Sequence, residues 1–326
     1  MIMNQTGFVF PGQGSQSVSM LDGWADHPIV VETLTEASEA LGENIARLIK
    51  EGPKEALALT TNTQPVMLVA GVAAYRVWMA EVGEIPAAVA GHSLGEYSAL
   101  VAAGVLTLTR AAPLVRFRAR AMQDAVPVGV GAMAAILGMD VALVISGCAD
   151  VTRDLQAQGG AMSEEVVEAV NFNDPAQTVI AGSKAAVEKA CEILKANGAK
   201  RALPLPVSAP FHSSLMKPAA EKLRERLEDT VFDVPQIAII NNIDVALEVD
   251  ADKIRDALYR QAFGPVRWVE CVRAIKARGI HIVVECGPGK VLAGLAKRID
   301  PDLTGLPMFD SASFADVKSS VLEAAS

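Results

Sequence analysis

Histidine is scarce in this sequence, and no pattern typical of a metal site accompanies it. The four histidines are His27, His92, His212 and His281. None belongs to an H-x-x-x-H pair or to a carboxylate cluster with metal-ligand spacing. We therefore expect no bound metal, and any chemistry that needs an imidazole must use one of these four residues.

Cysteine is equally scarce, and long apolar runs are missing. The four cysteines show no C-x-x-C spacing and lie in apolar stretches, at Cys148, Cys191, Cys271 and Cys286. Buried free cysteine behaves as a small hydrophobic residue, so we expect reduced, structural thiols. No uncharged apolar stretch reaches the roughly 18 residues of a membrane-spanning helix, and the first residues lack a basic segment followed by an apolar one. We expect a cytoplasmic protein without a membrane segment.

Positive charge is in deficit. The formal net charge is −9 at pH 7 and the pI is near 5.1, which argues against a nucleic-acid-binding surface. Basic clusters around Arg118 and in 195–201 still leave room for an acidic partner. With 51% hydrophobic residues among 326, the chain can bury the core of one large or two modest globular domains.

One serine lies in a pattern typical of a nucleophile elbow. Gly91-His92-Ser93-Leu94-Gly95 fits G-x-S-x-G, with an apolar strand before it and a helix after it. The chain must reverse within two or three residues, and a β-carbon at either glycine would crowd the backbone. A helix beginning near Leu94 directs free N–H groups toward an oxyanion beside Ser93. The pattern predicts Ser93 as a nucleophile.

A serine hydroxyl is a poor nucleophile without a base, and His212 is the best candidate. His92 is adjacent to Ser93, where neighbouring side chains diverge, so we expect it to pack beside the site. Two further histidines lie at a helix start and in an apolar strand. His212 lies in the loop 208–214, and loops at strand ends often carry such bases in α/β folds. A surface or helix-capping role for His212 stays open.

Strands and helices alternate on both sides of a compact central segment. Residues 131–206 have the order β-α-β-β-α-β, the signature of a ferredoxin-like small domain. Outside it, apolar strands at 6–10, 236–241 and 280–285 alternate with helices. This predicts an α/β fold with a doubly wound, mostly parallel sheet, similar to the α/β-hydrolase core.

The predicted domains are a large α/β domain in two parts, 1–128 and 207–326, and an inserted small domain, 129–206. Residues 149–165 look longer than the small domain needs, and we interpret them as a surface extension without an assigned function. Two helix starts are also predicted: a helix over 63–82 with Gln64-Pro65 in its first turn, and a helix capped by Thr109 that runs through Ala125.

Six short motifs follow one another along nearly the whole chain. They are 10–16 (F-P-G-Q-G-S-Q), 91–96 (G-H-S-L-G-E), 116–123 (R-F-R-A-R-A-M-Q), 209–212 (A-P-F-H), Gln261 followed by 264–266 (G-P-V), and 285–289 (E-C-G-P-G). In this order they resemble the malonyl-CoA:acyl carrier protein transacylases of fatty-acid synthesis. Agreement over six motifs is far more specific than G-x-S-x-G alone.

The resemblance implies a ping-pong reaction. Ser93 would be acylated by malonyl-CoA with release of coenzyme A, and the malonyl group would pass to the phosphopantetheine thiol of an acyl carrier protein. His212 would act as general base and then as general acid. Gln261 matches the position whose main-chain carbonyl orients the histidine in that family, so that a Ser-His dyad replaces a triad.

The resemblance also implies the residues that bind the substrate. Gln13 and the backbone N–H of Leu94 would form the oxyanion hole, and Arg118 would hold the malonyl carboxylate. A guanidinium meets a planar carboxylate with two parallel charge-assisted hydrogen bonds, which would select malonyl over acetyl groups. Neighbouring arginines leave this choice open by one helical turn, and Arg118 is chosen on motif alignment. Phe211 would narrow the acyl pocket.

No cofactor is expected, because the loops 11–16 and 286–290 lack the residues that dinucleotide and phosphate loops require. We expect a monomer. Alternatives remain at this point. A serine esterase or thioesterase would share Ser93 and His212, although it would usually carry an acidic third residue. A transacylase of polyketide synthesis or malonate decarboxylation would use the same residues. A non-catalytic carrier-binding module would have no use for them.

Overall fold

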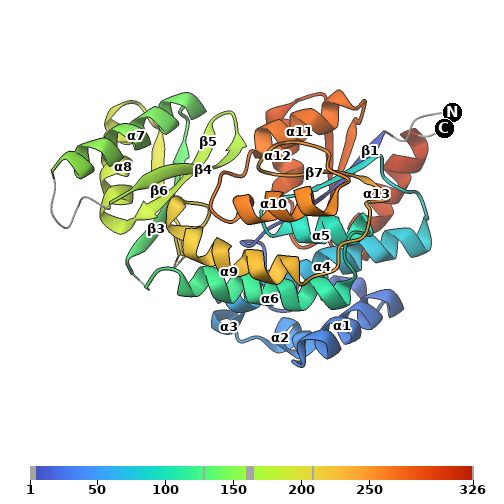
Figure 1. Cartoon of the computed structure of the whole chain (residues 1–326). Coiled ribbons are helices and arrows are strands. Elements are labelled where there is room, and N and C mark those ends of the chain that lie inside the picture. The colour runs from blue at the N-terminus through green and yellow to red at the C-terminus, as the bar shows by residue number, and fades with distance from the viewer. Residues whose placement is uncertain (1–4, 128, 159–164, 208, 325–326) are drawn as a thin grey trace. The chain divides into compact units, whose positions relative to one another are not determined.

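The computed structural model describes residues 5–127, 129–158, 165–207 and 209–324 (Figure 1). The chain divides into two compact units. The first unit comprises Met1–Arg120, Arg226–Ile254 and Glu270–Ser326, and the second comprises Ala121–Glu225 and Arg255–Val269. The predicted insertion, 129–206, falls inside the second unit. This unit extends beyond the insertion on both sides, to Ala121 and Glu225, and also includes Arg255–Val269.

A five-stranded parallel sheet is the centre of the first unit. Its strand order is β7-β2-β1-β8-β9, and every pairing is parallel. The strands are β1 (Thr6–Phe10), β2 (Ala88–Gly91), β7 (Ala238–Ile240), β8 (Ile282–Cys286) and β9 (Thr304–Met308). Strands β1, β2 and β8 are buried at every residue, as in a parallel sheet covered by helices on both faces. The predicted α/β fold with a mostly parallel sheet is confirmed.

Strand β9 was not predicted from the sequence. It contains Gly305 and Pro307, and both residue types weaken a strand. Proline lacks the N–H that a central strand must donate on one of its sides. β9 pairs with β8 alone, as the edge strand of the sheet, where that loss is tolerated.

The helices of the first unit surround this sheet. They are η1 (Asp22–Trp24), α1 (Pro28–Leu41), α2 (Ile45–Glu51), α3 (Lys54–Ala58), α4 (Thr60–Glu81), α5 (Gly95–Ala102), α12 (Val291–Ile299) and α13 (Ser311–Ala324). Four helices contain residues of both units: α6 (Leu108–Asp124), α9 (Lys217–Glu228), α10 (Ala251–Gln261) and α11 (Trp268–Ala277). Among the described residues, every helix is too short or too polar to span a bilayer.

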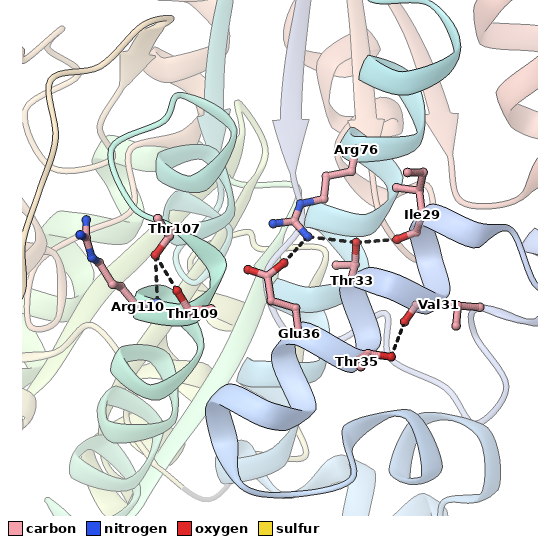
Figure 2. Close-up of polar contacts among 9 residues, drawn as sticks. All are labelled: Ile29, Val31, Thr33, Thr35, Glu36, Arg76, Thr107, Thr109 and Arg110. Atoms are coloured by element: carbon pink, nitrogen blue, oxygen red, sulfur yellow. Dashed lines mark hydrogen bonds and ion pairs between the residues drawn. The ribbon is translucent and has the colours of Figure 1, made fainter.

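Helix α4 is buried around most of its circumference, and one polar contact fixes α1 against it (Figure 2). Arg76 on α4 donates to Oε2 of Glu36 at 2.6 Å and to Oγ1 of Thr33 at 3.3 Å, both on α1. The Thr33 hydroxyl in turn donates to the carbonyl of Ile29 at 2.7 Å. The ion pair is partly buried, so it is screened less by solvent than a surface pair would be.

The predicted start of α4 was wrong by one turn. The helix begins at Thr60, so Pro65 lies inside it rather than in its first turn. A proline in that position leaves the carbonyl four residues earlier without its helical N–H partner. That carbonyl belongs to Thr61, and Nη1 of Arg116 donates to it at 2.6 Å. An arginine side chain therefore replaces the missing backbone donor.

The predicted cap of α6 was also wrong. The helix begins at Leu108, and the Oγ1 of Thr107 accepts a hydrogen bond from the N–H of Arg110 at 3.3 Å (Figure 2). Thr109 lies in the first turn, with its hydroxyl 2.8 Å from that of Thr107. Two threonines stand two residues apart, and the sequence pattern did not distinguish between them.

The second unit contains a four-stranded antiparallel sheet of order β4-β5-β3-β6. Its strands are β3 (Gly131–Leu137), β4 (Val167–Asp174), β5 (Gln177–Ser183) and β6 (Arg201–Pro204), with helices α7 (Val141–Ala157) and α8 (Lys184–Ala196). The predicted β-α-β-β-α-β order is confirmed, with the first and third strands in the centre. The two helices and the sheet share one apolar core that includes Ile136, Val144 and Ile180.

The interpretation of 149–165 as a loose surface extension needs a correction. Helix α7 continues to Ala157, and its residues Val151 and Leu155 are buried in the apolar core of the second unit. Residues 159–164 lie outside the described residues. None of the four cysteines is in a disulfide, and Cys148 packs into this same core.

The buried carboxyl group of Glu285, at the end of β8, makes the stability of the protein depend on pH. Burial raises its pKa from 4.5 to about 7, although the N–H of Ala293 at the start of α12 donates to Oε2 at 2.8 Å. A carboxyl with a raised folded-state pKa stabilises the fold fully below its unfolded pKa, and that contribution is lost as the pH rises through about 7. The loss amounts to about 3 kcal/mol.

We therefore expect Glu285→Gln to flatten the pH dependence of unfolding. Gln keeps an oxygen acceptor for Ala293 but does not titrate. Relative to the wild type, the variant should gain stability between pH 5 and pH 8 by about 2.5 kcal/mol, measured by urea unfolding at both values. The exposed Glu32→Gln serves as the control and should show no such gain. A constant difference between wild type and Glu285→Gln across this range would contradict the prediction.

Candidate active site

Ser93 occupies a tight reversal between β2 and α5 in the first unit. Its φ is 53°, in the left-handed region that residues with a β-carbon rarely adopt. The N–H of His92 donates to the carbonyl of Phe10 at 2.9 Å, and the N–H of Gly95 donates to the carbonyl of His92 at 2.9 Å. The first bond connects the reversal to the carboxyl end of β1, and the second closes the reversal itself. Ser93 itself is half-buried.

The two glycines of the reversal are required by space. A β-carbon on Gly91 would overlap the backbone of Gly95, and a β-carbon on Gly95 would overlap the carbonyl of Phe10. Both obstacles are backbone atoms that a side-chain rotation cannot move. The glycine pattern of the elbow therefore follows from the close approach of β1, β2 and the start of α5.

Asn242, which follows β7, holds the elbow from the other side. Its Oδ1 accepts the N–H of Ser93 at 2.7 Å, and its Nδ2 donates to the carbonyl of Gly91 at 2.7 Å. The N–H of Asn242 donates to Oε2 of Glu96 at 2.9 Å. Asn242 and Glu96 are almost completely buried. Three hydrogen bonds thus fix the backbone around Ser93, and such support is what a strained conformation needs in order to persist.

The guanidinium of Arg118 lies beside the Ser93 hydroxyl. Its Nη2 is 3.3 Å from Oγ of Ser93, and its Nη1 donates to Oε1 of Gln64 at 2.7 Å. The carbon at the centre of the guanidinium is 5.6 Å from the centre of the Tyr97 ring, within cation–π range. Arg118 is 2% exposed. A planar cation is therefore held within reach of a small group attached to Ser93.

The neighbouring arginines point to other partners. Arg116 forms an ion pair with Glu43 and donates to Asn62 at 2.7 Å, in addition to its bond to the carbonyl of Thr61. Arg120 is exposed and lies 3.7 Å from Glu43. Residues two positions apart on a helix point to different sides. This geometry singles out Arg118 beside Ser93.

Burial lowers the pKa of Arg118 below its ordinary value, and the nearby Tyr97 and Glu96 oppose that shift. Burial likewise raises the pKa of Tyr97 to about 12, so this residue is neutral at physiological pH. The direction of the Arg118 pKa shift reflects the cost of burying the charged guanidinium, which Tyr97 and Glu96 offset in part.

The proposed oxyanion donors lie on two loops of the first unit. Gly12, next to Gln13, is so close to the elbow that a β-carbon would sit 2.8 Å from the carbonyl oxygen of His92. Within 5–127, 129–158, 165–207 and 209–324, nothing accepts a hydrogen bond from the Gln13 amide or from the N–H of Leu94. Both donors are therefore available for an oxyanion.

His212 lies in the second unit, and it too has a left-handed backbone, with φ 67°. It is 4% exposed, and its Nδ1 is 2.8 Å from the main-chain carbonyl of Gln261, at the end of α10. A carbonyl only accepts, so Nδ1 carries the proton and Nε2 is the basic nitrogen of the neutral ring. Such a ring can take a proton at Nε2 while Gln261 holds its orientation.

A cavity of about 490 Å³ in the second unit is lined by His212, by the facing sides of α7 and β4, and by Phe263. Phe211 is buried, with its N–H donating to the carbonyl of Ala209, and it is not among the residues that line this cavity. Its effect on an acyl pocket stays a prediction.

The first unit has a serine at a nucleophile elbow with a guanidinium beside it, and the second unit has an imidazole whose Nε2 is basic; acyl transfer through a serine ester uses groups of these kinds. The described residues contain no group of three or more histidine, cysteine, aspartate and glutamate side chains that could hold a metal ion. Sequence reasoning missed Asn242, Gln64 and Tyr97. Each acts through a contact with a distant segment, and the buried polar character of Gln64 in an apolar helix was the one local signal.

The chain is similar to known proteins over nearly its whole length. The family model of the acyl transferase domain matches residues 7–299. Malonyl CoA-acyl carrier protein transacylase of Escherichia coli (strain K12) is 51% identical over 314 residues, which are 96% of this chain and 98% of that protein. An acyl-carrier-protein S-malonyltransferase from Burkholderia pseudomallei is 60% identical, with a TM-score of 0.92 and coverage of 97% and 99% of the two chains.

A further solved structure contains a carrier protein. It is described as a type II PKS acyl-carrier protein in complex with its malonyl-transacylase. The identity is 46%, the TM-score is 0.92, and the match covers 97% of this chain and 99% of that one.

We expect Asn242→Ala to destabilise the elbow strongly. The change leaves the N–H of Ser93 and the carbonyl of Gly91 without their buried partner, which should lower the free energy of unfolding by about 2 to 4 kcal/mol. Urea unfolding measures the change. The control is Asn44→Ala, which removes an exposed cap of α2 and should cost about 1 kcal/mol. Equal losses in the two variants would show that Asn242 has no special role.

Proposed function

The chain belongs to the acyl transferase family, as a malonyl-CoA:acyl carrier protein transacylase, and from this premise we propose which residues carry the reaction. The protein transfers the malonyl group from malonyl-CoA to acyl carrier protein and so supplies extender units for fatty-acid synthesis. We propose Ser93 as the nucleophile, which becomes a malonyl ester while coenzyme A leaves. In the second half of the reaction the carrier thiol attacks this ester.

His212 is the proposed proton carrier of both half-reactions. During attack on malonyl-CoA its Nε2 takes the proton of the Ser93 hydroxyl, and it then protonates the departing thiolate of coenzyme A. In the second half it takes the proton of the carrier thiol and returns it to Ser93. The carbonyl of Gln261 keeps the proton on Nδ1 and stabilises the imidazolium that forms each time. The dyad needs no acidic third residue.

Gln13 and the N–H of Leu94 are the proposed donors to the oxyanion of the tetrahedral intermediate. The N–H of Ser93 cannot serve, because Asn242 accepts it. Leu94 lies next along the chain, just before α5, so its N–H is at the positive end of that helix. His92 is proposed to border the site beside Gly12, and Phe211 to limit the size of the acyl group.

The observation that carries the proposal is the position of Arg118 beside Ser93. One methylene separates the ester carbonyl of a malonyl-serine from its free carboxylate. A cation that binds this carboxylate must therefore lie close to Ser93. Arg118 lies 3.3 Å from Oγ of Ser93 and is held in place by Gln64. An acetyl group offers no carboxylate to Arg118, so malonyl transfer gains a charge-assisted contact that acetyl transfer lacks, and the enzyme therefore discriminates against acetyl groups.

We further propose that coenzyme A is the released product and that the protein is monomeric and cytoplasmic. No cofactor takes part in the proposed reaction, since the thioester of the substrate supplies the activated acyl group.

The covalent step is tested by trapping the intermediate. Incubation with radiolabelled malonyl-CoA should leave one malonyl group per wild-type chain in acid-quenched protein, and Ser93→Ala should leave none. Addition of holo acyl carrier protein should then move the label to the carrier faster than free malonate appears. Undiminished label on Ser93→Ala would contradict the assignment, and faster release of malonate would indicate a hydrolase.

The role of Arg118 is tested by comparing two substrates. Arg118→Ala should lose roughly 30- to 4,000-fold in kcat/KM for malonyl-CoA, because a charge pair worth about 2 to 5 kcal/mol is missing. The ratio of acetyl to malonyl transfer should rise by a similar factor. Arg120→Ala, on the exposed side of the same helix, is the matched control and should behave as wild type. An equal loss for both substrates would mean that Arg118 only supports the fold.

A further inference from the structure

Glu168, on β4 of the second unit, is joined to the loop that carries His212. Its Oε2 accepts the N–H of Ser214 at 2.6 Å, across 46 positions of the chain. Ser214 is two residues after His212. Neither the motifs of the sequence nor the mechanism above uses Glu168.

The loop needs support because of its backbone. His212 has a φ of 67°, which costs free energy for a residue with a β-carbon and persists only where the surroundings impose it. Part of the support is local, because the Ser213 hydroxyl and the Ser213 N–H both donate hydrogen bonds to the carbonyl of Pro210. From outside the loop, Gln261 holds the ring and Glu168 holds the backbone that follows.

The chemistry of this second contact suits a carboxylate. Ser214 begins the short helix η3 (Ser214–Met216), which continues directly into α9, so its N–H lies at the positive end of a helical segment. Ser213 precedes that helix but provides no side-chain cap. Glu168 takes the place of the cap from another strand, with a charge-assisted hydrogen bond.

Glu168 and His212 also line the same cavity of about 490 Å³. Open space beside a catalytic loop lets the loop move unless it is tied at both ends. The hydrogen bond between Glu168 and the N–H of Ser214 fixes the end of the loop that follows His212, next to the cavity.

We propose that Glu168 is a positioning residue for His212, which fixes the loop at Ser214 so that the imidazole stays in the orientation set by Gln261. This inference rests on the proposed role of His212 as base. Glu168 need not touch the substrate. Removing it should lower the fraction of molecules with a competent His212, and should slow chemistry without weakening the binding of malonyl-CoA.

The first test measures malonyl-Ser93 formation in single turnovers over a range of malonyl-CoA concentrations. In Glu168→Ala the maximal rate should fall about tenfold, and the half-saturating concentration should stay unchanged. Glu168→Gln keeps the acceptor oxygen and should remain within about threefold of wild type. Glu188→Ala, an exposed glutamate on α8, is the matched control and should have the wild-type rate.

The second test removes the donor instead of the acceptor. Ser214→Pro lacks the N–H, and the site can accept proline because Ser213 is extended, with φ −87° and ψ 165°, and because proline suits the first position of a helix. This variant should also lose about tenfold in the maximal rate. The double variant Glu168→Ala/Ser214→Pro should lose no more than either single one, because both break the same bond.

The third test observes the imidazole directly. With four histidines in the chain, the side-chain NMR signals of ¹⁵N-histidine-labelled protein can be assigned by substitution. The Nδ1–H signal of His212, hydrogen-bonded to Gln261, should be sharp in the wild type and in Glu168→Gln. It should broaden or vanish in Glu168→Ala and in Ser214→Pro.

Several results would overturn the inference. These are a wild-type acylation rate in Glu168→Ala, a higher half-saturating concentration with an unchanged maximal rate, or additive losses of about a hundredfold in the double variant. A lower melting temperature with an unchanged rate and an unchanged Nδ1–H signal would show a merely structural role. If Glu168→Ala fails to fold, Ser214→Pro and Glu168→Gln decide the question. If the wild type forms no malonyl-serine at all, the proposed function itself fails.

Discussion

The left-handed backbone of Ser93 is the constraint from which the arrangement of the first unit follows. A residue with a β-carbon stays at a φ of 53° only if its neighbours leave it no alternative. The sheet meets this condition: the carbonyl of Phe10 accepts from one side of the reversal, and Asn242 binds it from the other. Strands β1, β2 and β7 are adjacent in that sheet, so their carboxyl ends deliver these contacts to one place.

The strained turn has a chemical use. The Ser93 N–H is bound to Asn242, and in the proposed mechanism the oxyanion therefore accepts from the next N–H along the chain, that of Leu94, at the start of α5. The same reversal lifts the Ser93 hydroxyl toward Arg118. In the proposed reaction, a malonyl carboxylate on Ser93 makes a charge-assisted hydrogen bond to this guanidinium, which an acetyl group cannot make. The proposed discrimination between malonyl and acetyl groups thus rests on the position of Arg118 beside Ser93.

How much the sequence predicted depends on the range of the interaction involved. The elbow glycines and the order of strands and helices have local signals, in glycine spacing and apolar periodicity, and the structure confirms the fold that they predicted. Pro65 was misplaced because its effect on α4 is compensated by Arg116, which comes 51 positions later. Asn242 lies 149 positions from Ser93, and no local pattern marks it as a partner. Motif alignment chose Arg118, whereas the physical reason became visible only with the partners of Arg116 and Arg120.

The two proposed catalytic residues lie in different units but are held in the same way. Ser93 and His212 both adopt left-handed backbone conformations, and each is held by hydrogen bonds from segments far away in the chain. Tertiary contacts of this kind oppose the strain and keep both residues out of ordinary conformations. Each unit must therefore be folded before its proposed catalytic residue takes the left-handed conformation. Positioning contacts such as those of Asn242 and Gln261 then matter for chemistry as much as the reacting atoms, since a displacement of about 1 Å is enough to slow a reaction by orders of magnitude.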